Sequence, residues 1–141
     1  MGALDGKAAI VTGSARGIGR ATAELLADQG ARVLINDLDG DVAEQAASEI
    51  AGETTVFGGD LTKAGVPDQL VQKAVDEFGR IDIIVNNAGY TWDGVAHKMA
   101  DDQFQAMLDI HTVAPFRIIR AAAPHLREPA KQEREEGREG F

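Results

Sequence analysis

Four short apolar segments alternate along the chain with longer segments whose apolar residues recur at every third or fourth position. The short segments are continuously apolar, as expected of parallel strands that are covered on both faces. β-Branched residues enrich the third of them, which favours a strand there as well. The pattern therefore predicts strands at residues 8–11, 33–35, 54–57 and 81–85.

The longer segments predict four helices, because this spacing places the apolar residues in one stripe along a helix. Gly30, Gly52 and Gly79 follow the first three stripes, and glycine is common just after the end of a helix. Pro115 and Pro124 lie within the fourth segment and are expected to bend it. The predicted helices run from residue 18 to about 29, from about 41 to 50, from 67 to 78, and from about 101 to 126.

Strands that alternate with helices imply parallel units with right-handed crossovers. The natural arrangement is an α/β, doubly wound, Rossmann-like parallel sheet with strand order 3-2-1-4. The sheet would then end at its fourth strand, whose apolar run would form an open edge. We therefore expect an incomplete domain whose later strands are missing from this chain. Residues 1–126 are assigned to that domain, and residues 127–141, which mix both charge signs, to a charged tail with some helix.

Composition and charge limit the kinds of binding partner and the cellular location that can be expected. The formal net charge is −9, which disfavours a nucleic acid partner because a phosphate backbone would be repelled. The sequence has no Cys, and its three His are too scattered to predict a metal site. No apolar run approaches the roughly 20 residues of a membrane helix, and no signal peptide is visible. These features predict a protein of the cytoplasm that has no membrane partner.

A glycine-rich turn lies between the first predicted strand and the first predicted helix. A diphosphate bound there needs close backbone N–H groups and the positive end of a helix dipole, so glycine is required where backbone meets phosphate. Glycines also cluster in turns for structural reasons alone, but the strand before and the helix after this turn favour the phosphate interpretation. The candidate residues are Gly13, Arg16, Gly17, Ile18 and Gly19.

Two acidic residues follow the next two strands. Asp37 could accept hydrogen bonds from the ribose 2′-OH of NAD and would repel the 2′-phosphate of NADP, although Arg16 could hold that phosphate. We favour NAD over NADP, because Asp37 lies at the ribose position itself. Asp60 could meet the exocyclic amine of adenine. Each carboxylate could instead serve only as a cap or turn residue.

These motifs, taken in order from Lys7 to Leu126, resemble the short-chain dehydrogenase/reductase family, in particular its 3-oxoacyl-[acyl-carrier-protein] reductase-like branch. The resemblance implies an NAD(P)-dependent oxidoreductase that transfers hydride between NAD(H) and a carbonyl or secondary alcohol, 3-oxoacyl thioesters included. It also implies a homo-oligomer for the complete protein. The cofactor-binding residues that it implies beyond the glycine turn are Asp37, Asp60, Leu61, Asn87, Ala88 and Gly89, of which Asn87 could equally tie neighbouring strands together.

The family's catalytic Ser and Tyr-x-x-x-Lys motif does not occur in these 141 residues. The one Tyr is Tyr90, and Gly94 stands where the Lys would be. We therefore expect the chain alone to be inactive and poorly stable. The alternatives are a non-catalytic NAD-binding module and a methyltransferase; the segment from Asn86 to Gly89 argues against the latter.

His111 aligns with the family's Asn of the fourth helix, and it is the catalytic candidate that this chain retains. The resemblance implies that the backbone carbonyl at this position holds a water molecule in a proton relay. Pro115 has no N–H to bond the carbonyl four residues earlier, so it should leave the His111 carbonyl free. Alternatively, His111 is a packed residue on a stripe with Phe104, Leu108 and Ile118.

Overall fold

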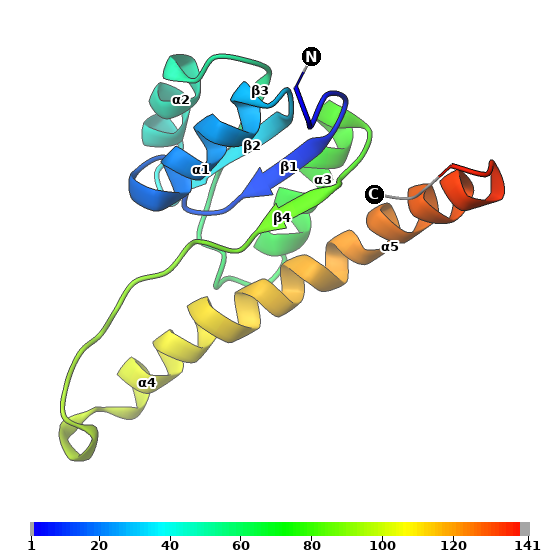
Figure 1. The fold of residues 1–141 in the computed structure, drawn as a ribbon. Coiled ribbons are helices and arrows are strands. Elements are labelled where there is room, and N and C mark those ends of the chain that lie inside the picture. Colours follow the sequence, from blue (N-terminus) through cyan, green and yellow to red (C-terminus); the bar gives the residue numbers. More distant parts are fainter. Residues whose placement is uncertain (1, 139–141) are drawn as a thin grey trace.

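Four parallel strands form one sheet in the computed structural model, which describes residues 2–138 (Figure 1). The strand order is β3-β2-β1-β4, which confirms the predicted topology. Ile10 of β1 pairs with Leu34 of β2 and Ile84 of β4, so β1 lies in the middle of the sheet. The strands are β1 (Ala8–Val11), β2 (Arg32–Asp37), β3 (Thr54–Gly58) and β4 (Ile83–Val85).

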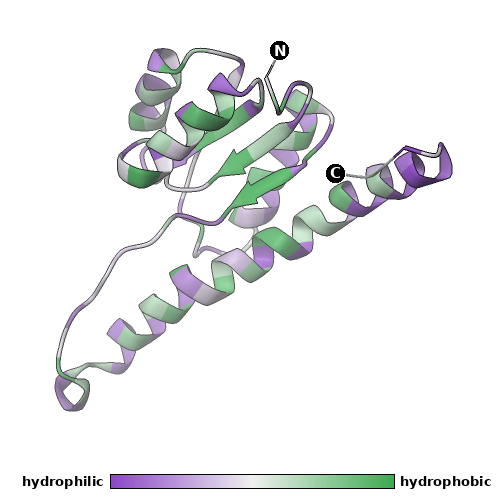
Figure 2. Cartoon of the chain, viewed as in Figure 1, coloured by the Kyte–Doolittle hydropathy of each residue, from purple (hydrophilic) through white to green (hydrophobic). Residues whose placement is uncertain are grey.

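Helices cover both faces of the sheet, α1 (Gly17–Asp28) and α2 (Gly40–Glu49) on one face and α3 (Val66–Phe78) and α5 (Ala114–Glu135) on the other. Alternate residues of each strand point to opposite faces, so Ile10 packs toward α3 and α5 while Val11 packs toward α1 and α2. Both side chains are fully buried, and burial of each contributes about 2 kcal/mol. Apolar strands between amphipathic helices are visible in Figure 2.

Local sequence signals set the ends of the first helices. The Asp39 carboxylate accepts the Asp41 N–H at 2.9 Å and caps the beginning of α2. Pro67 lies in the first turn of α3, where its missing N–H has no cost. Gly79 ends α3 with φ +74°, a conformation that favours glycine, and its N–H donates to the Val75 carbonyl.

The C-terminal helix is longer than predicted and changes form along its length. It consists of α4 (Asp101–Leu108), the π-helical segment η2 (Asp109–Val113) and α5, and it continues through Pro124 and Pro129. The prediction that it ends at Leu126 is wrong, because residues 127–135 are helical too. Residues 139–141 of the predicted tail lie outside the described residues. The extension lies against the segment before β4, where Glu133 is 3.5 Å from Arg80 and Ala130 borders Ile81, and these contacts support a helix although its sequence is highly charged.

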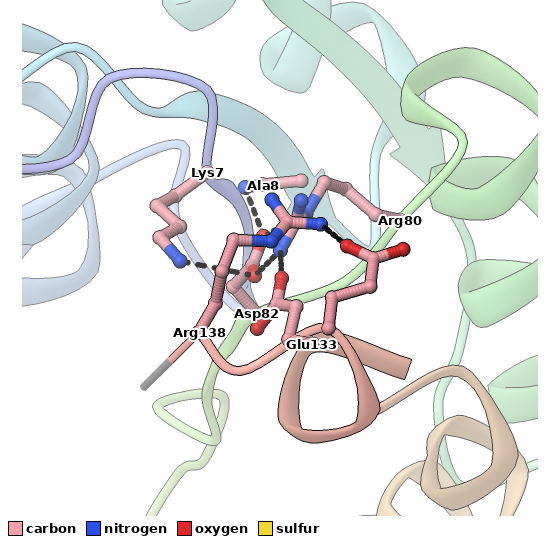
Figure 3. Close-up of polar contacts among 7 residues, drawn as sticks. Lys7, Ala8, Arg80, Asp82, Glu133 and Arg138 are labelled. Atoms are coloured by element: carbon pink, nitrogen blue, oxygen red, sulfur yellow. Dashed lines mark hydrogen bonds and ion pairs between the residues drawn. The ribbon is translucent and has the colours of Figure 1, made fainter. Parts of the chain in front are cut away.

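An ionic network links α5 to the residues at the beginning of β1 and just before β4 (Figure 3). Asp82 accepts the Ala8 N–H at 2.9 Å and the Arg80 Nε–H at 2.8 Å, and its carboxylate lies 3.8 Å from Lys7 Nζ. Arg80 also lies 3.5 Å from a carboxylate oxygen of Glu133 on α5. Burial alone would raise the pKa of Asp82, but the bonds from Arg80 and Ala8 and the nearby positive charges lower it.

No helix among residues 2–138 is long and apolar enough to cross a membrane. The location in the cytoplasm stays a prediction.

Candidate cofactor site

A cleft of about 1000 Å³ lies at the carboxyl ends of the strands. Open parallel sheets commonly bind ligands at this edge, where loops from neighbouring strands diverge. The cleft brings together the predicted site residues with two exceptions, Gly19 and His111. The predicted residues that line it are Gly13, Arg16, Gly17, Ile18, Asp37, Asp60, Leu61, Asn87, Ala88 and Gly89.

The three glycines of the turn after β1 are needed for different reasons. Gly17 has φ +60°, and an added Cβ would meet no atom within 4 Å, so its surface faces open space. Gly13 also has a positive φ, and its Cβ would lie 2.9 Å from Ala88 Cα. A Cβ on Gly19 would lie 2.4 Å from both the Gly13 carbonyl oxygen and Asn87 Nδ2. Gly19 therefore allows close packing beneath the turn, while Gly17 keeps the cleft side open.

The amino end of α1 opens into this cleft. Gly17 and Ile18, the first two residues of α1, line it, and the Ile18 side chain is 81% exposed. Within the described part of the chain, α1 has no side-chain cap and no acidic residue in its first turn. Its first N–H groups and positive dipole end are therefore available to an anionic ligand.

Asp37 ends β2 at the rim of the cleft. Its side chain is 11% exposed, and its carboxylate accepts the Asp39 N–H at 3.0 Å. Arg16 Nε lies 3.5 Å from the other carboxylate oxygen, but the Arg16 side chain is 71% exposed. Because the Arg16 side chain lies largely in solvent, this ion pair contributes about 1 kcal/mol or less, so Arg16 can leave Asp37 at little cost.

Asp60 follows β3 and makes local bonds. Its Oδ1 accepts the Thr62 hydroxyl at 2.6 Å and the Thr62 N–H at 2.9 Å. The hydroxyl bond is the main cause of the lowered pKa of Asp60, against a smaller opposing effect of burial. Asp60 therefore acts as a turn residue, which is one of the two roles considered for it. Its contact with adenine stays a prediction. Leu61, which is buried, lines the cleft beside it.

Asn87 ties β4 to the turn after β1, as one of the two predicted roles requires. Its Nδ2 donates to the carbonyls of Thr12 at 3.1 Å and Gly13 at 3.2 Å. In return, Thr12 Oγ1 accepts the N–H groups of Asn87 at 3.0 Å and Ala88 at 2.9 Å. These four bonds fix the spacing between the two loops that border the cleft.

Asn36 is a site residue that the sequence analysis missed. Its Oδ1 accepts the Gly13 N–H at 3.1 Å, and its Nδ2 donates to the Phe57 carbonyl at 2.9 Å. The side chain is buried and links the ends of β1, β2 and β3 beneath the cleft. A signal was present, since Asn36 directly follows the apolar run 33–35, and a polar side chain that becomes buried there needs hydrogen-bond partners.

His111 lies at the β4 side of the cleft without lining it. Its Nε2 is 2.8 Å from the Tyr90 carbonyl oxygen, and Tyr90 lines the cleft. The packed stripe that was the alternative for His111 is buried only at Ile118, because His111, Phe104 and Leu108 are exposed. The relay role of the His111 carbonyl stays a prediction. Before Pro115, where a bend was expected, the helix takes the π form of η2, and the Ala114 N–H donates five residues back to the Asp109 carbonyl.

The family model for short chain dehydrogenases matches residues 7–138. The chain belongs to the short-chain dehydrogenase/reductase family, as its motifs indicate. It is 39% identical over 136 residues to a hydroxyacyl-CoA dehydrogenase of Mycobacterium tuberculosis, covering 91% of this chain and 43% of that protein. It is 37% identical over 127 residues to a 3-oxoacyl-[acyl-carrier-protein] reductase of Synechocystis, covering 87% and 51%.

Solved structures confirm the fold. A short-chain dehydrogenase from Mycobacterium avium matches with a TM-score of 0.84 and 33% identity, over 97% of this chain and 50% of that one. A metagenomic short-chain oxidoreductase in complex with NADP matches with a TM-score of 0.82 and 34% identity, over 87% and 57%. The chain spans about half the length of the relatives that it matches. Members of the family bind nicotinamide cofactors.

Proposed function

We propose that this chain is the cofactor-binding part of an NAD-dependent oxidoreductase. The complete enzyme would transfer hydride between NAD(H) and a carbonyl or secondary alcohol. The observation that carries the proposal is the pairing of Asp37 with the uncapped amino end of α1 in one cleft. The functions named for the relatives support a 3-oxoacyl or 3-hydroxyacyl thioester as the substrate.

The residues present fit a dinucleotide. The cleft volume suits a ligand of that size, and the open space over Gly17 lets a diphosphate reach the first N–H groups of α1. Gly13, Arg16 and the first turn of α1 would hold the diphosphate. When bound, the nicotinamide ring supplies the hydride acceptor or donor.

The adenosine half would lie toward β2 and β3. Asp37 would accept the ribose hydroxyls, and Asp60 would receive the adenine amine at Oδ2, because Oδ1 is engaged by Thr62. Leu61 would offer apolar contact to the base. The segment from Asn87 to Gly89 would border the middle of the cofactor.

NAD is proposed as the preferred cofactor. A 2′-phosphate beside Asp37 would bring two anions together in a site where the carboxylate is largely shielded from water. Arg16 could offset part of this repulsion by turning from Asp37 to the phosphate. The metagenomic short-chain oxidoreductase that this chain resembles was solved in complex with NADP, so the fold by itself does not exclude that cofactor.

The 141 residues contain no Tyr-x-x-x-Lys motif, so we expect the chain alone to bind NAD without turnover. A non-catalytic NAD-binding module would behave in the same way. We also propose that the complete protein is a homo-oligomer, since Phe104, Phe116 and Ile119 leave an apolar surface exposed along α4 and α5.

Isothermal titration calorimetry of the chain with NAD and NADP tests the proposal, with tighter binding of NAD expected. Gly17→Ala should weaken NAD binding at least about tenfold, because its Cβ would intrude where the diphosphate meets α1. Gly65→Ala is the matched control. Gly65 also has a positive φ and open space around it, but it does not line the cleft.

Equal weakening by Gly17→Ala and Gly65→Ala would show that strain, rather than the lost approach to α1, explains the result. No binding of either cofactor by the unaltered chain would overturn the proposed function.

A further inference from the structure

His111 contacts the loop after β4 through both its ring edge and a ring nitrogen. Its Nε2 is 2.8 Å from the Tyr90 carbonyl oxygen. A Cβ added to Gly89 would lie 2.5 Å from His111 Cε1, so the ring packs closely against one side of Gly89, which is otherwise exposed. One side chain on η2 thus holds two consecutive residues of a loop that is distant in the sequence.

The acceptor in this hydrogen bond determines which ring nitrogen of His111 carries a hydrogen. A carbonyl oxygen can only accept a hydrogen bond, so Nε2 of His111 must carry the hydrogen. In the neutral ring, Nδ1 is then the acceptor nitrogen. The contact with Tyr90 therefore selects one tautomer of His111.

Both residues that His111 holds line the cleft, and so does Ile110 beside it. In the sheet order, β4 lies on one side of β1, and β2 and β3 lie on the other. Asp37 and Asp60, at the ends of β2 and β3, would contact the adenosine half of the cofactor. The half of a dinucleotide beyond the diphosphate would therefore extend toward β4 and meet Gly89 and Tyr90.

We propose that His111 is a positioning residue that holds the Gly89–Tyr90 segment in place for the nicotinamide ring of the cofactor. This inference rests on the proposed function. It assigns the role to the imidazole ring, which acts through the backbone of Gly89 and Tyr90, rather than to the His111 carbonyl.

The test compares NAD with ADP-ribose, which retains everything except nicotinamide, in titrations of the 141-residue chain. His111→Phe keeps a ring over Gly89 but removes the donor to Tyr90. It should weaken NAD binding by about threefold to tenfold, the range expected for one hydrogen bond, and leave ADP-ribose binding unchanged. His111→Gln retains an N–H of similar reach and should restore most of the NAD affinity. His97→Phe, an exposed site outside the cleft, is the matched control and should change neither affinity.

Nuclear magnetic resonance of the imidazole nitrogens gives a second readout, with the hydrogen of neutral His111 expected on Nε2. The inference is overturned if that hydrogen resides on Nδ1. It is also overturned if His111→Phe affects both ligands equally, which would indicate a general structural role, or affects neither. If the unaltered chain binds ADP-ribose and NAD equally well, nicotinamide has no contact to position and the inference fails alone. Binding of neither ligand would overturn the proposed function, and this inference with it.

Discussion

Cofactor choice should depend on the charge of Asp37, and Asp37→Asn tests this with almost no change in shape. The carboxylate is mostly buried at the rim of the cleft and accepts the Asp39 N–H, which an amide oxygen can also accept. Folding should therefore change little. The substitution removes the charged acceptor for the ribose hydroxyls and releases Arg16 from its ion pair at 3.5 Å.

The magnitude follows from two effects. A hydrogen bond to a charged group contributes about 1.5–3 kcal/mol, and its neutral replacement about half of that, so NAD binding should weaken about threefold to tenfold. For NADP, the repulsion is removed and Arg16 can turn to the phosphate. If Arg16 approaches the phosphate as closely as it now approaches Asp37, at 3.5 Å, the contact of this solvent-exposed side chain is worth about 1 kcal/mol and strengthens NADP binding about fivefold. The ratio of the two affinities should thus change by about 15-fold to 50-fold in favour of NADP.

Calorimetric titration with both cofactors at one ionic strength measures this ratio. Asp28→Asn is the matched control, because it changes the net charge equally at the opposite end of α1. The reasoning is refuted if Asp37→Asn weakens both cofactors by the same factor, or if Asp28→Asn shifts the ratio as much.

Two further predictions concern stability. The pKa of Asp82 is lower in the folded chain than its value of about 4 in the unfolded chain. The charged carboxylate therefore stabilises the fold at pH values above about 4, and this contribution is lost as the pH falls through the folded pKa. Asp82→Asn should therefore lower the free energy of unfolding by about 1–3 kcal/mol at neutral pH and by less in acid. Urea unfolding at several pH values measures this difference, and a difference that does not change with pH would contradict the prediction. Gly19→Ala should lower the free energy of unfolding by about 1–3 kcal/mol, because its Cβ would lie 2.4 Å from the Gly13 carbonyl oxygen. The comparison is Gly94→Ala, where a Cβ meets no atom within 4 Å; equal effects of the two substitutions would count against the packing argument.

The sequence by itself determined the order of the elements and most residues of the cleft. Continuous apolar runs and helical stripes are local signals, and the crossover rules convert their alternation into a single sheet order. Because parallel strands end at one edge, Asp37 and Asp60 could be placed at the cleft from their positions after β2 and β3. Gly17 was predictable for the same reason, since a turn at this edge opens a helix toward the ligand.

Tertiary structure decided how residues distant in the sequence meet. The charged residues after Leu126 gave no local reason for a stable helix, and their contacts with the segment before β4, Glu133 beside Arg80 among them, supplied one. Gly19 packs against Asn87 and does not line the cleft, which spacing within the turn could not show, and its contact with the cofactor stays a prediction.

The partner of His111 likewise could not be predicted from the sequence, because it is the backbone carbonyl of Tyr90 in the loop after β4. Its position depends on where η2 brings the ring after the whole chain has folded. Every residue has a backbone carbonyl, so the sequence does not indicate which one will accept a hydrogen bond from a given side chain. Which carbonyl a side chain can reach depends on how the complete helices and strands pack. Local spacing therefore determined the order of the helices and strands and the residue types at the strand ends. Packing in three dimensions determined which side chains and backbone groups fix the positions of those residues.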